Sequence, residues 1–297
     1  MPDSRYIDTP HGPIHVRTTE GGGGEVAVAV HGLGGSARNW DPIAARLDRT
    51  VVAVDLPGFG RSTPRPGDQI DAQVGAVVEV IETLGIDSVT LVGNSMGGLV
   101  CQLVAAARPE TVATMVLIAP ATPLPPRTPP SDPAVAARLV TQSLPGVGSF
   151  ISRRLQERST PVQIVDATFA LLTANRGSIS PAAIEAAIEN AELRRSMPWA
   201  PDTFAASAAA VRRRLVRRSA FVALVRKMPA RTLLIWGDQD RLVSPSSMRW
   251  LASLRPDWTA VEMEGIGHVP MLESPATVIE MITRWTTGQE TARTAGG

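Results

Sequence analysis

Short apolar runs alternate with longer segments of helical period along the chain, and this alternation restricts the fold more than any other feature. The runs are rich in β-branched or aromatic residues and lie at 26–30, 51–54, 89–92, 115–118, 232–236 and 258–263. Parallel strands buried on both faces read as continuous apolar runs, and each needs a long crossover, usually a helix, to reach the next. The chain is therefore predicted to be α/β, with a mostly parallel, doubly wound sheet.

The segments between and around these runs agree with that prediction. Val74, Val77, Val78, Ile81 and Leu84 recur at spacings of three and four, which is typical of one face of a helix. Residues 6–18 predict a hairpin around a turn rich in proline and glycine, and residues 276–285 predict a final helix. The residues after Gly288 carry little that could pack, so we expect a frayed tail there.

The alternation is interrupted once, by a long insertion. A proline-rich stretch at 122–133 leads into a segment of helical pattern that ends near residue 227, and the strand pattern then resumes. Because the later strands must complete the same sheet, the insertion interrupts one domain. We predict a core domain at 1–120 and 228–297 and a helical cap at 121–227.

Composition and charge exclude several classes of binding partner for this protein. The net charge of +1 gives no long-range field for nucleic acid or an anionic membrane, and no window approaches the roughly 20 apolar residues of a membrane span. The single cysteine, Cys101, excludes an internal disulfide, and no leader is evident at the N-terminus. We therefore expect a cytoplasmic protein with a small-molecule substrate, no nucleic-acid partner and no integral membrane association. A homodimer is left open.

The strongest local signal is the five-residue stretch Gly93-Asn94-Ser95-Met96-Gly97. It comes directly after the run 89–92 and directly before a helical segment at 98–107. A sharp turn from strand to helix exposes the central serine as a nucleophile, and glycines on both sides relieve the crowding. The simpler interpretation is a glycine-rich turn whose serine only caps the helix. We predict that Ser95 is the nucleophile.

A serine nucleophile needs a base, and His268 is the best-placed histidine. It lies in the loop 265–270, after the last strand and before the last helix, at the carboxyl edge of the sheet where Ser95 also lies. The other three histidines, in the N-terminal hairpin and at the end of the first long strand, are His11, His15 and His31.

The base in turn needs a carboxylate that fixes its tautomer. The loop after the run 232–236 offers Asp238 and Asp240, and the alternative position after the run 115–118 offers no acid. Asp240 lies further along the loop and reaches toward His268, whereas Asp238 is more suited to capping the turn. We predict Asp240 as the third member, and the order serine, aspartate, histidine is the one expected for this type of sheet.

An oxyanion needs backbone donors, and two are predicted. Met96 follows the nucleophile at the start of a helix, and Leu33 lies in a glycine-rich loop after the first long strand. Three further residues are candidates for lining a substrate pocket: Trp40, Asn94 and Val269. Neither zinc-ligand spacing nor a phosphate-binding loop is seen, so no metal or cofactor is expected.

Together these pieces resemble the α/β-hydrolase fold superfamily, in particular its esterases and lipases with a helical cap. The matching segments are 31–35, 55–62, 93–98, 236–240 and 267–270. The resemblance also favours Asp240 as the acid, and the serine at position 95 argues against the epoxide hydrolase and haloalkane dehalogenase branches. Asn94 is similar to hydrolases that cleave carbon–carbon bonds in meta-ring-fission products, but Val269 stands where those enzymes carry tryptophan.

The predicted function is hydrolysis of a carboxylic ester, thioester or lactone of a largely apolar small molecule, through an acyl-enzyme on Ser95. A carbon–carbon bond hydrolase, a lyase, a perhydrolase and an inactive binding module on the same fold are the alternatives.

Two further patterns suggest other ligands. The stretch 32–37 fits a dinucleotide-binding pattern, with Asp55 at a suitable distance, and would indicate hydride transfer. The arginines at 212–214 and 217–218 could bind phosphates but read more simply as the solvated side of a cap helix.

Overall fold

The computed structural model describes residues 2–288, so the tail expected after Gly288 lies outside the described residues. Eight strands form one sheet among the described residues. Five of the six predicted apolar runs lie wholly within strands, and the run 258–263 begins one residue before its strand. The strands are β1 Asp3–Ile7, β2 Ile14–Thr19, β3 Val26–Val30, β4 Thr50–Val54, β5 Val89–Asn94, β6 Val112–Ile118, β7 Arg231–Gly237 and β8 Thr259–Met263. The valine-rich strands in the middle are almost wholly buried, as strands covered on both faces must be.

The sheet has the order β1-β2-β4-β3-β5-β6-β7-β8. The β1–β2 and β2–β4 pairs are antiparallel and every later pair is parallel, which confirms the mostly parallel sheet. The strand order reverses at β3, which has β4 on one side and β5 on the other. Loops that leave neighbouring strands at such a switch point diverge and open a crevice between them. The glycine-rich loop after β3 and the turn after β5 meet at this point.

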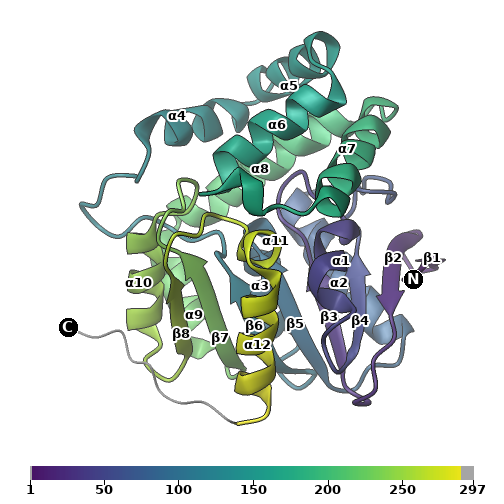
Figure 1. Ribbon diagram of the computed structural model, residues 1–297, viewed down its shortest axis with the longest axis vertical. Coiled ribbons are helices and arrows are strands. Elements are labelled where there is room, and N and C mark those ends of the chain that lie inside the picture. Colours follow the sequence, from purple (N-terminus) through teal and green to yellow (C-terminus); the bar gives the residue numbers. More distant parts are fainter. Residues whose placement is uncertain (1, 289–297) are drawn as a thin grey trace.

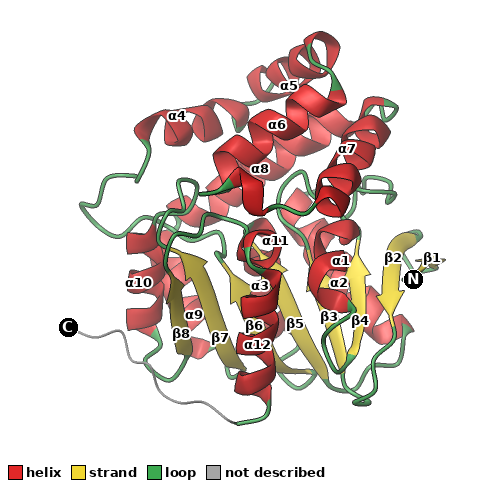
Figure 2. Ribbon diagram, viewed as in Figure 1, coloured by secondary structure: helices red, strands yellow, loops and turns green. Residues whose placement is uncertain are grey.

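Helices cover both faces of the sheet (Figure 2). One face packs against α2 Gln69–Thr83, α3 Met96–Ala107, α9 Arg218–Lys227 and α10 Pro245–Leu254. The other face packs against α1 Asp41–Ala44, α11 Pro270–Glu273 and α12 Pro275–Thr286. Two hydrophobic clusters result, one on each side of the sheet, and together they form the core of a doubly wound α/β domain.

Five helices between β6 and β7 lie over the carboxyl ends of the parallel strands (Figure 1). They are α4 Pro133–Gln142, α5 Val147–Arg158, α6 Pro161–Leu172, α7 Pro181–Arg195 and α8 Ala200–Val216. The following helix α9 instead contacts α3 and α10, beside the sheet. The domain boundaries at residues 120 and 227 stay a prediction. None of the helices described within residues 2–288 has the length and apolar character to cross a bilayer.

Candidate active site

Ser95 lies on a sharp turn between β5 and α3. Its backbone angles are φ 55° and ψ −120°, a region that side chains rarely adopt. The turn is possible because its flanks are glycines: a Cβ on Gly97 would lie 2.1 Å from the Val30 carbonyl oxygen, and one on Gly93 would lie 2.6 Å from Cys101 Sγ. The Ser95 side chain is thereby held at the carboxyl edge of the sheet, with its residue only partly buried.

The glycine-rich loop after β3 leans against the same serine. A Cβ on Gly32 would lie 3.2 Å from Ser95 Cβ, so the loop reaches Ser95 only because residue 32 has no side chain. Leu33 is the next residue of this loop, and Met96 is the first residue of α3. The structure brings these two predicted oxyanion donors to the neighbourhood of Ser95, and their role stays a prediction.

His268 and Asp240 form a buried pair. The carboxylate can only accept, so His268 Nδ1 donates to Asp240 Oδ2, at 2.7 Å. Asp240 Oδ1 accepts the N–H groups of Leu242 at 2.8 Å and Val243 at 3.0 Å, which fixes the carboxylate. With Nδ1 protonated, Nε2 of a neutral imidazole carries the lone pair of a base.

The other acid of this loop has a different partner. Asp238 Oδ1 accepts the N–H of Gly265 at 2.8 Å and thereby ties the two loops together. Asp240, the predicted acid, contacts the histidine, whereas Asp238 contacts the Gly265 N–H. The catalytic role of Asp240 stays a prediction.

Asn94, the residue before Ser95, contacts the histidine loop. Its side-chain amide donates to the Ile118 carbonyl at 3.0 Å and to the His268 carbonyl at 3.2 Å. Among residues 2–288 no hydrogen bond joins the Ser95 hydroxyl to His268, and catalytic hydrogen bonds are often long before a substrate binds. Asn94 was predicted as a pocket residue; the structure places its amide on backbone carbonyls.

The cap is fastened to the histidine loop by contacts that the sequence analysis missed. His268 N donates to the Leu172 carbonyl at 2.7 Å, at the end of α6. The Glu273 carboxylate accepts the N–H of Gly267 at 2.8 Å and that of Ala174 at 2.8 Å, so one side chain bridges the core and the cap. Burial raises the pKa of Glu273; these N–H donors oppose the rise without cancelling it. A glutamate in a short helix gives no sequence signal of this role.

Arg194 was also missed. From α7 it donates to the Gly34 carbonyl at 3.0 Å, in the loop that carries Leu33, and its guanidinium lies over the rings of Phe59 and Phe204. Burial lowers its pKa to about 10. Within residues 2–288 no carboxylate forms an ion pair with it, whereas five other arginines of the cap have such partners. Arg194 is partly buried, and a partly desolvated cation without an anion beside it is a common feature of sites that bind anionic groups.

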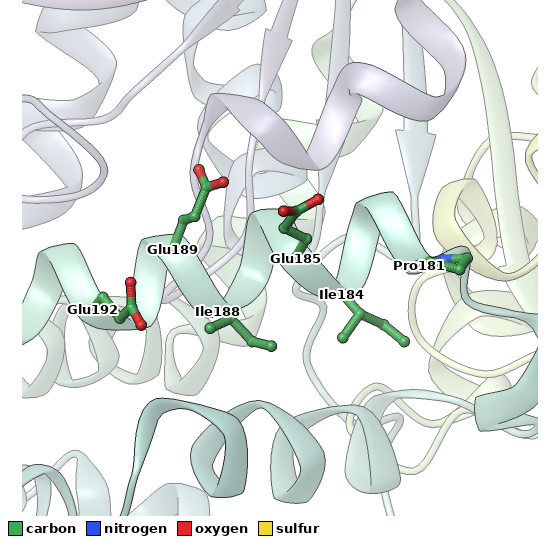
Figure 3. Close-up of a pocket in the computed structure, with 6 residues that line it drawn as sticks. All are labelled: Pro181, Ile184, Glu185, Ile188, Glu189 and Glu192. Carbon is green, nitrogen blue, oxygen red and sulfur yellow. The ribbon is translucent and has the colours of Figure 1, made fainter.

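The remaining pocket candidates are core residues. Trp40 and Val269 are buried in the hydrophobic cluster on the α1 and α12 face of the sheet. A surface pocket of about 600 Å³ lies elsewhere, on helix α7 (Figure 3). Ile184 and Ile188 point to one side of that helix, and Glu185 and Glu189 point to the other. It contains none of the predicted site residues, and the pocket roles of Trp40 and Val269 stay predictions.

The structure does not support the dinucleotide-binding interpretation, because its acidic residue, Asp55, is occupied by contacts within the protein. Asp55 is buried and accepts hydrogen bonds from His15 Nδ1, Ala37 N and Arg61 N. A short 3-10 helix at Ala37–Trp40 follows the glycine-rich loop, where dinucleotide-binding folds carry a long helix. Both carboxylate oxygens of this buried side chain are thus bound by donors of the protein itself.

Two of the five arginines at 212–214 and 217–218 form ion pairs with acidic residues of the core domain. Arg213 pairs with Asp68 at 2.6 Å and Arg214 pairs with Asp71, so two of the five cations fasten α8 to α2. Among the described residues, 2–288, no group of three or more histidine, cysteine or acidic side chains is placed to hold a metal ion.

Comparison with known proteins places this fold and site in a family. The sequence pattern of the alpha/beta hydrolase family matches residues 27–281. Since this match covers well over half of the chain, the protein belongs to the alpha/beta hydrolase family.

Individual relatives are either similar over most of the chain at low sequence identity or more similar over about a third of it. Lipase 3 of Moraxella sp. is 26% identical over 259 residues, which are 84% of this chain and 74% of that protein. A shorter stretch of 113 residues is 40% identical to the dihydrolipoyllysine-residue acetyltransferase component of the acetoin cleaving system of Cupriavidus necator; it covers 36% of this chain and only 30% of that protein.

Solved structures share the fold over nearly the whole chain. A thermophilic esterase from Thermogutta terrifontis has a TM-score of 0.72 at 24% identity, covering 97% of this chain and 100% of that one. The 2-hydroxy-6-oxo-6-phenylhexa-2,4-dienoate hydrolase of a Rhodococcus species has a TM-score of 0.75 at 20% identity, with the same coverage of 97% and 100%. These likenesses confirm the α/β-hydrolase fold.

Proposed function

We propose that this protein is a serine hydrolase that cleaves carboxylic esters of small, largely apolar molecules. The observation that carries the proposal is the buried 2.7 Å bond between His268 and Asp240, held by Asn94 next to the turn that presents Ser95. A base with a fixed tautomer near an accessible serine hydroxyl is the arrangement that acyl transfer requires. The names of the esterase and of Lipase 3 agree with ester cleavage.

The mechanism follows from these positions. Ser95 Oγ attacks the substrate carbonyl carbon while His268 Nε2 takes its proton and Asp240 stabilises the imidazolium. The N–H groups of Leu33 and Met96 hold the oxyanion, which the positive end of α3 also favours. His268 then protonates the leaving alcohol. Water attacks the acyl-enzyme by the same route, releases the acid and restores Ser95. Thioesters and lactones fit the same steps.

The test compares p-nitrophenyl esters of graded acyl length on the wild type and on Ser95→Ala. Loss of the nucleophile should lower kcat by about 10⁴-fold or more. Ser246→Ala serves as a matched control, because Ser246 lies in the first turn of α10 and bonds to Ser244 rather than to the histidine. Equal hydrolysis by the wild type and Ser95→Ala would overturn the proposal.

A second candidate is favoured by Arg194: hydrolysis of a substrate that itself carries a carboxylate. The guanidinium has no acid partner among residues 2–288 and contacts the loop of Leu33, so a carboxylate bound there would lie close to the reacting bond. Two structural neighbours are named for carboxylate substrates, the dienoate hydrolase and an E-2-(acetamidomethylene)succinate hydrolase. Cleavage of a carbon–carbon bond, which the dienoate hydrolase exemplifies, would be distinguished from ester cleavage by identifying the products.

A further inference from the structure

A second serine, histidine and aspartate are joined by hydrogen bonds far from Ser95. Ser4 Oγ lies 2.8 Å from His15 Nε2, and His15 Nδ1 lies 2.7 Å from Asp55 Oδ2. The three residues come from β1, from β2 and from the position just after β4, and those strands are neighbours in the sheet. Each link has the length of a strong hydrogen bond.

Asp55 fixes the direction of both hydrogen bonds among Ser4, His15 and Asp55. Burial raises the pKa of Asp55, but the bond from His15, the charge of His31 and the N–H groups of Ala37 and Arg61 outweigh it, so the pKa is lowered and the carboxylate is ionised. An ionised carboxylate only accepts, so His15 Nδ1 donates to it. Nε2 of the neutral ring then accepts the Ser4 O–H. A general base needs this orientation.

The exposure of the three side chains increases from Asp55 to Ser4. Asp55 and His15 are buried, whereas Ser4 is exposed on β1, the edge strand of the sheet. Tyr6 packs its ring edge against His15, with ring centroids 5.2 Å apart, and bonds to the Arg61 carbonyl, which restricts the imidazole further. Three strands, β2, β4 and β3, separate β1 from β5, the strand that ends just before Ser95. An electrophile can therefore reach Ser4 without entering the site under the cap.

We propose that Ser4 is a second activated serine that accepts an acyl or phosphonyl group from an activated aryl ester or a fluorophosphonate. Ser4 Oγ attacks the carbonyl carbon or the phosphorus, and His15 Nε2 takes its proton. The bond to the aryloxide or fluoride breaks, and the leaving group departs with that proton. The products are an O-acyl or O-phosphonyl Ser4 and a phenol or hydrogen fluoride. Asp55 orients His15 and stabilises its charged form.

The experiment uses full-length Ser95→Ala protein, in which the proposed catalytic serine is removed. Excess fluorophosphonate is added, and the modified peptides are quantified by mass spectrometry over time. Trypsin releases Ser4 in the peptide 1–5 and the control Ser131, an exposed serine, in the peptide 128–138. We expect Ser4 to be modified at least about tenfold faster than Ser131, because a positioned base accelerates the attack. A parallel series with p-nitrophenyl acetate should give the Ser4 acetyl ester.

His15→Gln in the same background supplies the second readout. It keeps a polar side chain but removes the base, so modification of Ser4 should fall to the rate of Ser131. Ser4 reacting no faster than Ser131, or equally fast in a folded His15→Gln protein, would overturn the proposal and leave the three residues as a purely structural link. If His15→Gln does not fold, the comparison of Ser4 with Ser131 in the folded Ser95→Ala protein decides alone. Neither outcome depends on whether Ser95 is the nucleophile.

Discussion

The side-chain amide of Asn94 donates to the backbone carbonyl of His268 at 3.2 Å, across 174 positions of sequence. The residue before the proposed nucleophile, Ser95, therefore holds the loop that carries the proposed base, His268. Asn94→Ala removes this donor and the one to Ile118, so we expect kcat for p-nitrophenyl esters to fall by roughly tenfold or more, through misplacement of His268. Stability should fall by about 1–3 kcal/mol, because two buried carbonyls lose their donor.

Gln102→Ala is the matched control for Asn94. Gln102 is buried and donates to the Gly98 carbonyl within α3, without a contact to the histidine loop. Its removal should cost a comparable stability, measured by urea unfolding, and leave kcat nearly unchanged. A similar loss of kcat in both variants would mean that Asn94 acts only through stability.

Asp240 and Asp238 provide a test within one loop. Asp240→Asn keeps the shape of the side chain, but an amide no longer fixes the proton of the imidazole on His268 Nδ1. We therefore expect kcat to fall by about 10⁴-fold. Asp238→Asn weakens only the bond from the Gly265 N–H and should change kcat by less than about tenfold. The reverse ranking, measured as kcat with one ester, would assign the acid to Asp238.

Two glycine substitutions should have opposite effects on stability. A Cβ on Gly97 would lie 2.1 Å from a backbone oxygen that cannot yield, so Gly97→Ala should lower the unfolding free energy by roughly 3 kcal/mol or abolish folding. Gly75 lies inside α2 with no atom within 4 Å of its missing Cβ. Gly75→Ala should therefore raise stability by about 0.5–1 kcal/mol. Thermal unfolding followed by circular dichroism measures both.

The raised pKa of Glu273 leads us to expect that the free energy of unfolding depends on pH. Its pKa is raised in the native protein, chiefly by burial and despite the Ala174, Gly267 and Asn175 N–H groups, with the charge of Asp240 adding to the rise. A native state that binds the proton more tightly gains stability below the unfolded pKa of about 4.3, and that gain is lost as the pH rises through the native pKa.

Glu273→Gln has no such titration and gives the reference for that measurement. We expect the unfolding free energy of the wild type, relative to Glu273→Gln, to fall as the pH increases from about 4 toward 7. Urea unfolding at each pH measures the difference. A difference that rises with pH would mean that the N–H donors, and not burial, dominate at this carboxylate.

Arg194 predicts a preference for acidic substrates. Arg194→Gln should raise KM for an ester with a free carboxylate, such as a mono-p-nitrophenyl dicarboxylate, by about 10- to 100-fold, the loss of a charged hydrogen bond. The uncharged ester of equal chain length should be affected much less. Arg195→Gln is the control, since Arg195 is exposed and bonds to the Ser159 carbonyl. Equal losses for both esters would show that Arg194 acts through the Gly34 carbonyl alone.

The sequence by itself determined the parts of the fold that depend on local pattern. The run 26–30 was located to the residue as β3, because a strand buried on both faces must be apolar throughout. The turn at Ser95 was also predictable, since glycines on both sides of a serine between strand and helix have few other uses. The family followed from the same short motifs, because they encode strand-end positions.

Tertiary structure alone decided which distant groups meet. The bridge from Glu273 to Ala174 spans 99 positions, and the contact of Arg194 with Gly34 spans 160, so no periodicity or spacing could indicate either. The link from Ser4 through His15 to Asp55 likewise depends on the order in which β1, β2 and β4 pair. A local pattern reports how a residue sits on its own element; the partners of a buried polar group are set by the packing of elements against one another.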